Sequence, residues 1–143
     1  MLNCRVIFIN GPVNSGKSTV GKLLSEQMPD AVFLEGDQIV SQEGLDQAKW
    51  IIATVMTGTL RACELAHEGK IPIIAFPLRD KDWKVIAGLC EHAGVHPICI
   101  SLDPESEVAF SSLTLKNSKE TPQEAPQEIC DQILSYLRKS EMH

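Results

Sequence analysis

The sequence predicts an α/β protein in which one parallel five-stranded sheet lies between two layers of helices. Two observations predict this three-layer αβα sandwich. Apolar runs of strand length alternate with longer helical stretches, and this alternation places helices on both faces of a parallel sheet. The glycine-rich stretch GPVNSGKS, residues 11–18, lies between the first apolar run and the first helical stretch, as a phosphate-binding loop requires. The length of 143 residues fits a single domain over residues 1–143.

Five short runs predict the strands. The first four are rich in apolar residues, and the third is almost entirely apolar, which is typical of a central strand covered on both faces. In chain order the predicted strands are Val6–Ile9, Ala31–Leu34, Ile71–Phe76, Ile98–Leu102 and Ser112–Lys116.

The predicted helices fill the intervals between the strands. The first follows the glycine-rich stretch and ends near Met28, because Pro29 and Asp30 come next. A long helix is expected over Leu45–His67, with a possible break near Gly58, and Gly69 ends it. Its apolar stripe belongs to the core, or in part to a substrate wall or a dimer surface. The remaining predictions are a helix from Asp80 or Lys81 to Ala93, a short helical turn through Phe110, and a last helix containing Ile129, Ile133, Leu134 and Leu137.

Composition excludes several classes of function. The net charge of −6 argues against broad contact with nucleic acid, which requires a basic surface. Five cysteines without a Cys-x-x-Cys pair favour neither a disulfide framework nor a zinc ribbon. The spacing of His92 and His96 resembles a metal pair, but Gly94 between them breaks the helix, so we expect no metal there. With no long apolar segment near the start, we expect a cytoplasmic protein without a membrane span.

The glycine-rich stretch has the chemistry of a site for nucleotide phosphates. Gly11 and Gly16 allow the backbone N–H groups to approach phosphate oxygens, and the following helix adds its positive end. Lys17 can reach the β- and γ-phosphates, and the Ser18 hydroxyl can bind a magnesium ion. The predicted nucleotide-binding residues are Gly11, Pro12, Val13, Asn14, Ser15, Gly16, Lys17, Ser18 and Thr19.

Charged residues follow two other predicted strands. Glu35 and Asp37 lie two residues apart after the second strand, so one carboxylate can hold magnesium while the other accepts a proton from a hydroxyl group. The alternative is an acidic, solvated loop. Arg79 follows the third strand and can stabilise charge on a phosphoryl group or bind an anionic substrate. The alternative for Arg79 is an exposed residue at the start of a helix.

The stretch GPVNSGKSTVGKLL, followed by FLEGD, resembles the small phosphate-loop kinases, such as gluconate kinase, shikimate kinase, adenylyl-sulfate kinase and chloramphenicol phosphotransferase. The resemblance implies strand order 2-3-1-4-5, ATP and Mg²⁺ as cofactors, and a small-molecule acceptor. By this resemblance Glu35 helps to position magnesium and Asp37 contacts the acceptor. The expected catalytic residues are then Lys17, Asp37 and Arg79. The resemblance also implies that Asn117 and Ser118 lie near the adenine.

The sequence departs from these kinases where they carry an arginine-bearing lid. Only DPESEVAFSS separates the fourth and fifth predicted strands, and none of these ten residues is basic. The end of the third strand has Phe76 and Pro77 where an aspartate is expected, and the guanine-recognition motif Asn-Lys-x-Asp is absent. Three functions therefore stay open: a small-molecule kinase with Arg79 in place of the lid cations, a non-catalytic nucleotide-binding protein, and a slow nucleotide hydrolase. The acceptor is not identified, and either a monomer or a homodimer is compatible with the sequence.

Overall fold

The computed structural model describes residues 4–11, 16–102, 111–115 and 125–141. Its sheet contains β1 (Arg5–Asn10), β2 (Ala31–Glu35), β3 (Ile71–Ala75), β4 (His96–Ser101) and β5 (Leu113–Thr114). The strands are parallel and lie in the order β2-β3-β1-β4-β5, which confirms the predicted topology.

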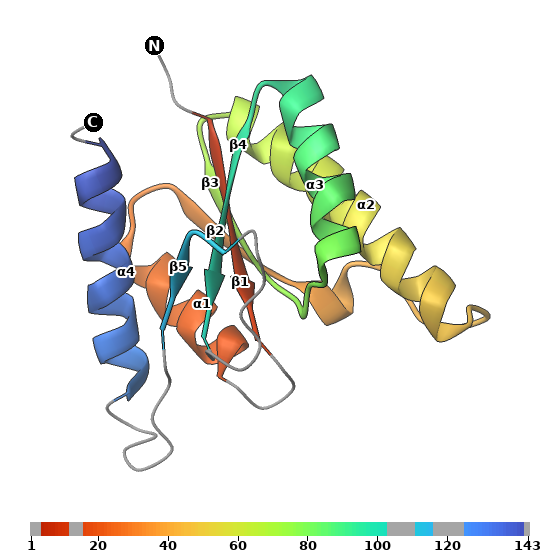
Figure 1. Ribbon diagram of the computed structural model, residues 1–143, viewed down its shortest axis with the longest axis horizontal. Helices are drawn as coiled ribbons and strands as arrows, with labels where there is room; N and C mark the ends of the chain where they lie inside the picture. The colour runs from red at the N-terminus through yellow and green to blue at the C-terminus, as the bar shows by residue number, and fades with distance from the viewer. Residues whose placement is uncertain (1–3, 12–15, 103–110, 116–124, 142–143) are drawn as a thin grey trace.

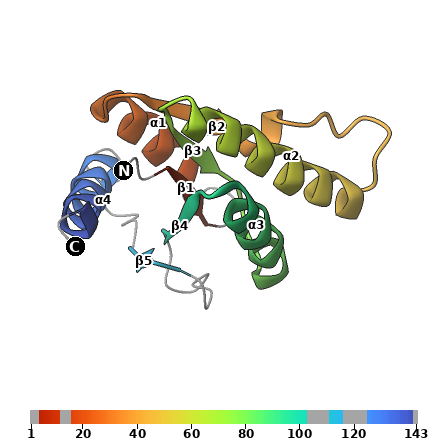
Figure 2. The same ribbon diagram turned by 90° about the horizontal axis from the view of Figure 1, so that it is seen from above.

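Helices cover both faces of this sheet (Figures 1 and 2). On one face lie α1 (Lys17–Gln27) and α4 (Ala125–Glu141), and on the other lie α2 (Gln47–His67) and α3 (Asp80–Ala93). A short 3-10 helix, η1 (Gly36–Gln38), follows β2. The three-layer αβα sandwich is therefore confirmed.

Successive side chains of β1 point to opposite faces of the sheet and so belong to two separate core clusters. Ile7 and Ile9 belong to the cluster that α1 and α4 complete, whereas Val6 and Phe8 belong to the cluster that α2 and α3 complete. Each face of the sheet is thus buried against a pair of helices, which explains why β1 is apolar at successive positions.

The predicted long helix differs from α2 in two respects. Helix α2 begins at Gln47, two residues after the predicted start at Leu45. The side chain of Asp46 caps its first turn by accepting a hydrogen bond of 2.9 Å from Lys49 N. The helix also continues through Gly58. A Cβ atom there would lie 2.9 Å from Ile39 Cδ1, so this glycine gives Ile39 space against the helix. Gly69, with φ of 88°, lies just beyond the helix end, as expected.

Smaller differences affect the strand ends. The fourth strand begins two residues earlier than Ile98. In the described part of the predicted fifth strand, residues 112–115, β5 contains Leu113 and Thr114, while Ser112 N and Leu115 N also donate to carbonyl oxygens of β4. The predicted helical turn through Phe110 lies outside the described residues. Among the described residues, no helix is both long enough and apolar enough to cross a membrane.

Candidate nucleotide and acceptor site

The junction between β1 and α1 presents helix N–H groups at the carboxyl edge of the sheet. Gly16 adopts φ of 87°, a left-handed conformation that favours glycine, and its carbonyl accepts the first helical bond, 2.9 Å from Val20 N. Among the described residues no side chain makes a capping hydrogen bond to α1, and the positive end of the helix dipole at this terminus suits an anion. Gly11 is buried at the end of β1, while the predicted contacts of Pro12, Val13, Asn14 and Ser15 lie outside the described residues.

The first turn of α1 is joined to the end of β2 by a direct hydrogen bond. Ser18 Oγ donates to Glu35 Oε1 over 2.9 Å, although the two residues come from different elements. The predicted pair of magnesium-binding residues is therefore brought together. An alcohol oxygen beside a carboxylate oxygen suits Mg²⁺, which binds to few protein oxygens and retains water or phosphate oxygens as its other ligands.

Lys17 interacts electrostatically with both acidic residues at the end of β2, Glu35 and Asp37. Burial lowers the pKa of its ammonium group from the usual 10.5, and the negative charges of Asp37 and Glu35 oppose this shift. The cation and the two carboxylates thus share one end of the sheet. Thr19, the last residue of the predicted loop set, is exposed on the same turn.

Gly36 positions the acidic pair against the neighbouring strand. A Cβ atom at this position would lie 2.5 Å from the Ala75 carbonyl oxygen and 2.5 Å from Phe76 Cδ1. The chain between Glu35 and Asp37 can therefore approach β3 this closely only because residue 36 lacks a side chain. Glu35 is half-buried and Asp37 is exposed, so the second carboxylate is accessible to a small molecule.

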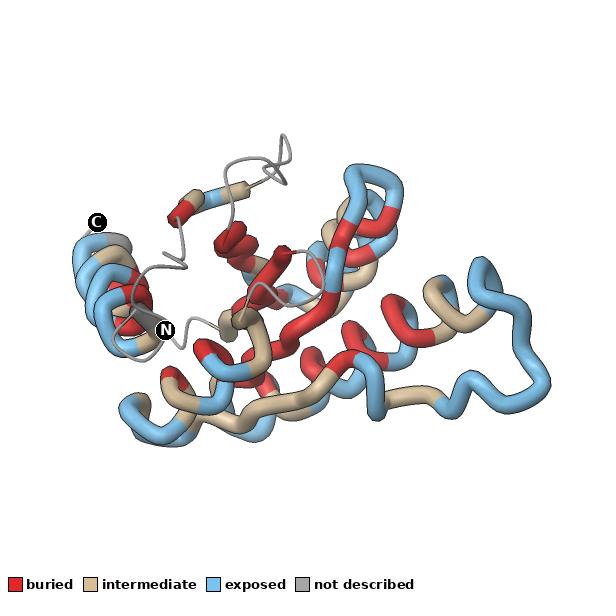
Figure 3. The backbone as a smooth tube through the Cα atoms, turned by 90° about the horizontal axis from the view of Figure 1, so that it is seen from below, coloured by how far each residue is buried: buried red, intermediate tan, exposed pale blue. Residues whose placement is uncertain are grey.

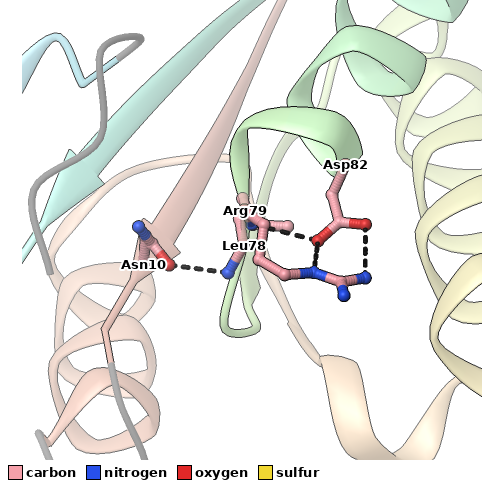
Figure 4. A network of polar contacts seen from close by, with 4 residues as sticks. All are labelled: Asn10, Leu78, Arg79 and Asp82. Carbon is pink, nitrogen blue, oxygen red and sulfur yellow. Dashed lines mark hydrogen bonds and ion pairs between the residues drawn. The ribbon is translucent and has the colours of Figure 1, made fainter. Parts of the chain in front are cut away.

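Arg79 is held by a neighbour on its own helix. Its Nε donates to Asp82 Oδ2 at 2.9 Å and its Nη2 donates to Asp82 Oδ1 at 3.1 Å, while Asp82 Oδ2 also accepts from Arg79 N. Figure 4 shows this paired guanidinium extending away from Asn10. Hydrogen bonding to Asp82 raises the pKa of Arg79. The described geometry thus gives Arg79 a fixed position at the start of α3, and its side chain is half-exposed.

Asn10 links the strand ends behind the phosphate loop, a role that sequence reasoning missed. Its Oδ1 accepts a bond of 2.7 Å from Leu78 N, and its Nδ2 donates to Ser101 Oγ at 3.4 Å. Ser101 Oγ lies 2.6 Å from Ser111 Oγ. The available signal was a polar residue that ends an apolar run immediately before Gly11. Asn10 is 2% exposed, so its amide fixes the ends of β1, β3 and β4 relative to one another.

Comparisons with known proteins support the fold. No family model matches the chain. It is 25% identical to a shikimate kinase from Streptomyces coelicolor over 119 residues, which cover 78% of this chain and 67% of that protein. A structure of a variant APS kinase from Mycobacterium tuberculosis superposes with a TM-score of 0.77 at 17% identity, covering 96% of this chain and 99% of that one. Shikimate kinase from Aquifex aeolicus gives a TM-score of 0.67 at 17% identity, with 96% and 98% covered.

The fold is that of the small phosphate-loop kinases. The resemblance found in GPVNSGKSTVGKLL and FLEGD is thereby confirmed in sequence and in topology. Four of the predicted site residues lie near one another in the structure. Ser18 is hydrogen-bonded to Glu35, and the charges of Glu35 and Asp37 act on Lys17. Asn117, Ser118 and residues 103–110, where a shortened lid was expected, lie outside the described residues. No group of three or more His, Cys, Asp or Glu residues suited to a metal ion occurs in the described ranges.

Proposed function

We propose that this protein is an ATP-dependent kinase that transfers the γ-phosphoryl group to a hydroxyl group of a small metabolite. The observation that carries the proposal is the hydrogen bond of 2.9 Å between Ser18 Oγ and Glu35 Oε1. It brings a residue of the phosphate loop and the acidic end of β2 to one place, where a nucleotide and an acceptor would have to meet. The kinase fold and the shikimate kinase relative support the same reaction class.

Each residue has a separate task in this proposal. The backbone from Gly11 to Thr19, with Asn117 near the adenine, binds the nucleotide. The Lys17 ammonium group binds the β- and γ-phosphates, while Ser18 and Glu35 hold Mg²⁺, directly or through water. When bound, the metal ion would neutralise charge on the transferring group. The partial burial of Lys17 favours this assignment, since an anionic phosphate offsets the cost of burying its charge.

Asp37 is the proposed general base. Its exposed carboxylate follows Gly36 and can accept the proton of the acceptor hydroxyl as that oxygen forms its bond to phosphorus and the bond to the ADP oxygen breaks. Arg79 stands at the start of the adjacent α3, and we assign it the stabilisation of negative charge on the phosphoryl group or on an anionic acceptor. In the structure Nε and Nη2 donate to Asp82 and the guanidinium group extends away from Asn10 (Figure 4), so this role requires the side chain to turn toward the phosphate loop.

The proposal places the protein in the cytoplasm with nucleotide and a small acceptor as its ligands. All five cysteines are free thiols, as a reducing compartment favours. The acidic net charge gives no support to a nucleic-acid substrate.

The test begins with a thermal-shift screen of Mg-ATP together with candidate sugars and hydroxy acids, because a ligand that binds the folded state raises its melting temperature. Any acceptor found is then used to compare wild-type protein with Asp37→Asn. Loss of a general base predicts a decrease in turnover of about 10²- to 10⁴-fold, with nucleotide affinity nearly unchanged.

Turnover by Asp37→Asn at the wild-type rate would exclude Asp37 as the base. Binding of ATP without any acceptor or hydrolysis would favour a non-catalytic nucleotide-binding protein. Release of phosphate from ATP at the same rate with or without acceptor would favour a slow hydrolase.

A further inference from the structure

Helix α2 exposes a row of large apolar side chains that the nucleotide site does not use. Ile52 is 55% exposed, Met56 is 42% exposed and Leu60 is 49% exposed. They are spaced by four residues, so they lie along one side of the helix, which we call the α2 stripe. The buried positions Val55 and Ala62 lie about 100–120° around the helix from the middle of the stripe. The stripe therefore borders the buried side of the helix and is exposed along its edge.

The position of α2 leaves this side accessible. The helix lies at the outside of the fold, and its amino-terminal half extends beyond the sheet (Figure 2). The loop that precedes it, residues 41–46, is exposed along its whole length (Figure 3). A continuous apolar row at such a position is typical of an interaction surface.

Two opposite charges flank the α2 stripe almost symmetrically. Lys49 precedes Met56 by seven residues and Glu64 follows it by eight, and both are exposed. With a rise of about 1.5 Å per residue, each charge lies roughly 10–12 Å from Met56 along the helix axis. Lys49 also lies 3.8 Å from Asp46, but both side chains are mostly exposed, and a surface pair of this kind holds the lysine only weakly.

This near-symmetry determines which partner fits. When a second copy of α2 is placed antiparallel with its two-fold axis at Met56, Ile52 meets Leu60 of the other copy and Met56 meets Met56. The same register brings Lys49 opposite Glu64 at both ends. A parallel arrangement would instead place lysine opposite lysine and glutamate opposite glutamate, so charge complementarity favours the antiparallel pair.

We propose that the α2 stripe is the interface of a homodimer in which two copies of α2 pack antiparallel about Met56. The dimer is a property of this surface and does not depend on the proposed kinase reaction. It would bury three large apolar side chains from each copy while keeping the nucleotide site of each copy at the carboxyl edge of its own sheet.

Sedimentation equilibrium over a wide range of protein concentration tests the proposal. Wild-type protein should form dimers, and Met56→Glu should weaken self-association by at least about tenfold, because two glutamates would face each other across the axis. The matched control is Val85→Glu on α3, since Val85 is 39% exposed but lies outside the stripe. This control should leave the dimer unchanged, and circular dichroism should show that all variants are folded.

Charge reversal tests the register. Lys49→Glu or Glu64→Lys alone should weaken the dimer several-fold at low salt, because each substitution alters two symmetry-related contacts, and the double variant should restore it. A wild-type protein that stays monomeric, or a dimer that persists in Met56→Glu, would overturn the proposal. Equal disruption by Val85→Glu, or single reversals without rescue by the double variant, would also count against the antiparallel α2 interface.

Discussion

Replacing Gly36 with alanine should disturb both stability and the acidic end of β2. The new methyl group would lie 2.5 Å from the Ala75 carbonyl oxygen and 2.5 Å from Phe76 Cδ1, much closer than van der Waals contact allows. One of these neighbours is backbone in β3 and cannot move alone, so the segment carrying Glu35 and Asp37 must shift. Overpacking of this kind costs about 1–3 kcal/mol. For a domain of this size, that corresponds to a melting temperature lower by roughly 3–10 °C.

The assay combines calorimetric melting with titration of Mg-ATP. We expect Gly36→Ala to melt earlier and to bind Mg-ATP more weakly, because Glu35 would move relative to Ser18. Gly88→Ala is the matched control, since no atom lies within 4 Å of the added Cβ on α3. There alanine should stabilise the helix by up to about 1 kcal/mol. A Gly36→Ala protein with wild-type melting and affinity would refute the close approach of η1 to β3.

Two further substitutions test the buried polar groups around the site. Asn10→Ala removes the acceptor of the 2.7 Å bond from Leu78 N, and a buried donor without a partner costs about 1–3 kcal/mol. Thermal unfolding should therefore show a clear loss of stability. An unchanged melting temperature would contradict the role of Asn10 in linking the strand ends. Thr54→Val should instead stabilise the protein by about 1 kcal/mol in the same assay, because Thr54 Oγ1 has no hydrogen-bond partner within the described ranges and borders an apolar cavity of about 10 Å³. Destabilisation by valine would indicate that the hydroxyl group is satisfied, for example by a buried water.

The topology could be predicted because local and global signals agree. The run Ile71–Ala75 is apolar at nearly every position, and such a strand is stable only in the middle of a parallel sheet. The glycine pattern before α1 predicted a site at the carboxyl edge of the sheet, and the motif after β2 predicted Glu35 and Asp37 as members of it. Residue type and spacing thus identified both residues of the contact between Ser18 and Glu35, while the choice of Glu35 over Asp37 for magnesium came from the resemblance to the small phosphate-loop kinases.

The remaining features depend on contacts between distant or competing groups. Arg79 was predicted from its place after β3, but its bidentate bond to Asp82 depends on where α3 begins and how the first turn is capped. The link from Asn10 to Leu78 joins residues separated by 68 positions, which no local pattern encodes. Among the described residues of the predicted fifth strand, β5 contains only Leu113 and Thr114, although Ser112 N and Leu115 N also donate to the Cys99 and Ser101 carbonyl oxygens, so the strand bounds depend on contacts with β4 that the local pattern does not give.

The central claim is that the β1–α1 junction binds nucleotide phosphates with Lys17 as the principal cation. Isothermal titration of Mg-ATP into wild-type protein and Lys17→Ala tests it most directly. We predict saturable binding by the wild-type protein and a loss of at least about tenfold in affinity for Lys17→Ala, corresponding to about 1.4 kcal/mol or more. Lys22→Ala on the exposed side of α1 should bind as the wild-type protein does. Equal affinity of the wild-type and Lys17→Ala proteins, or no binding by the folded wild-type protein, would contradict the claim.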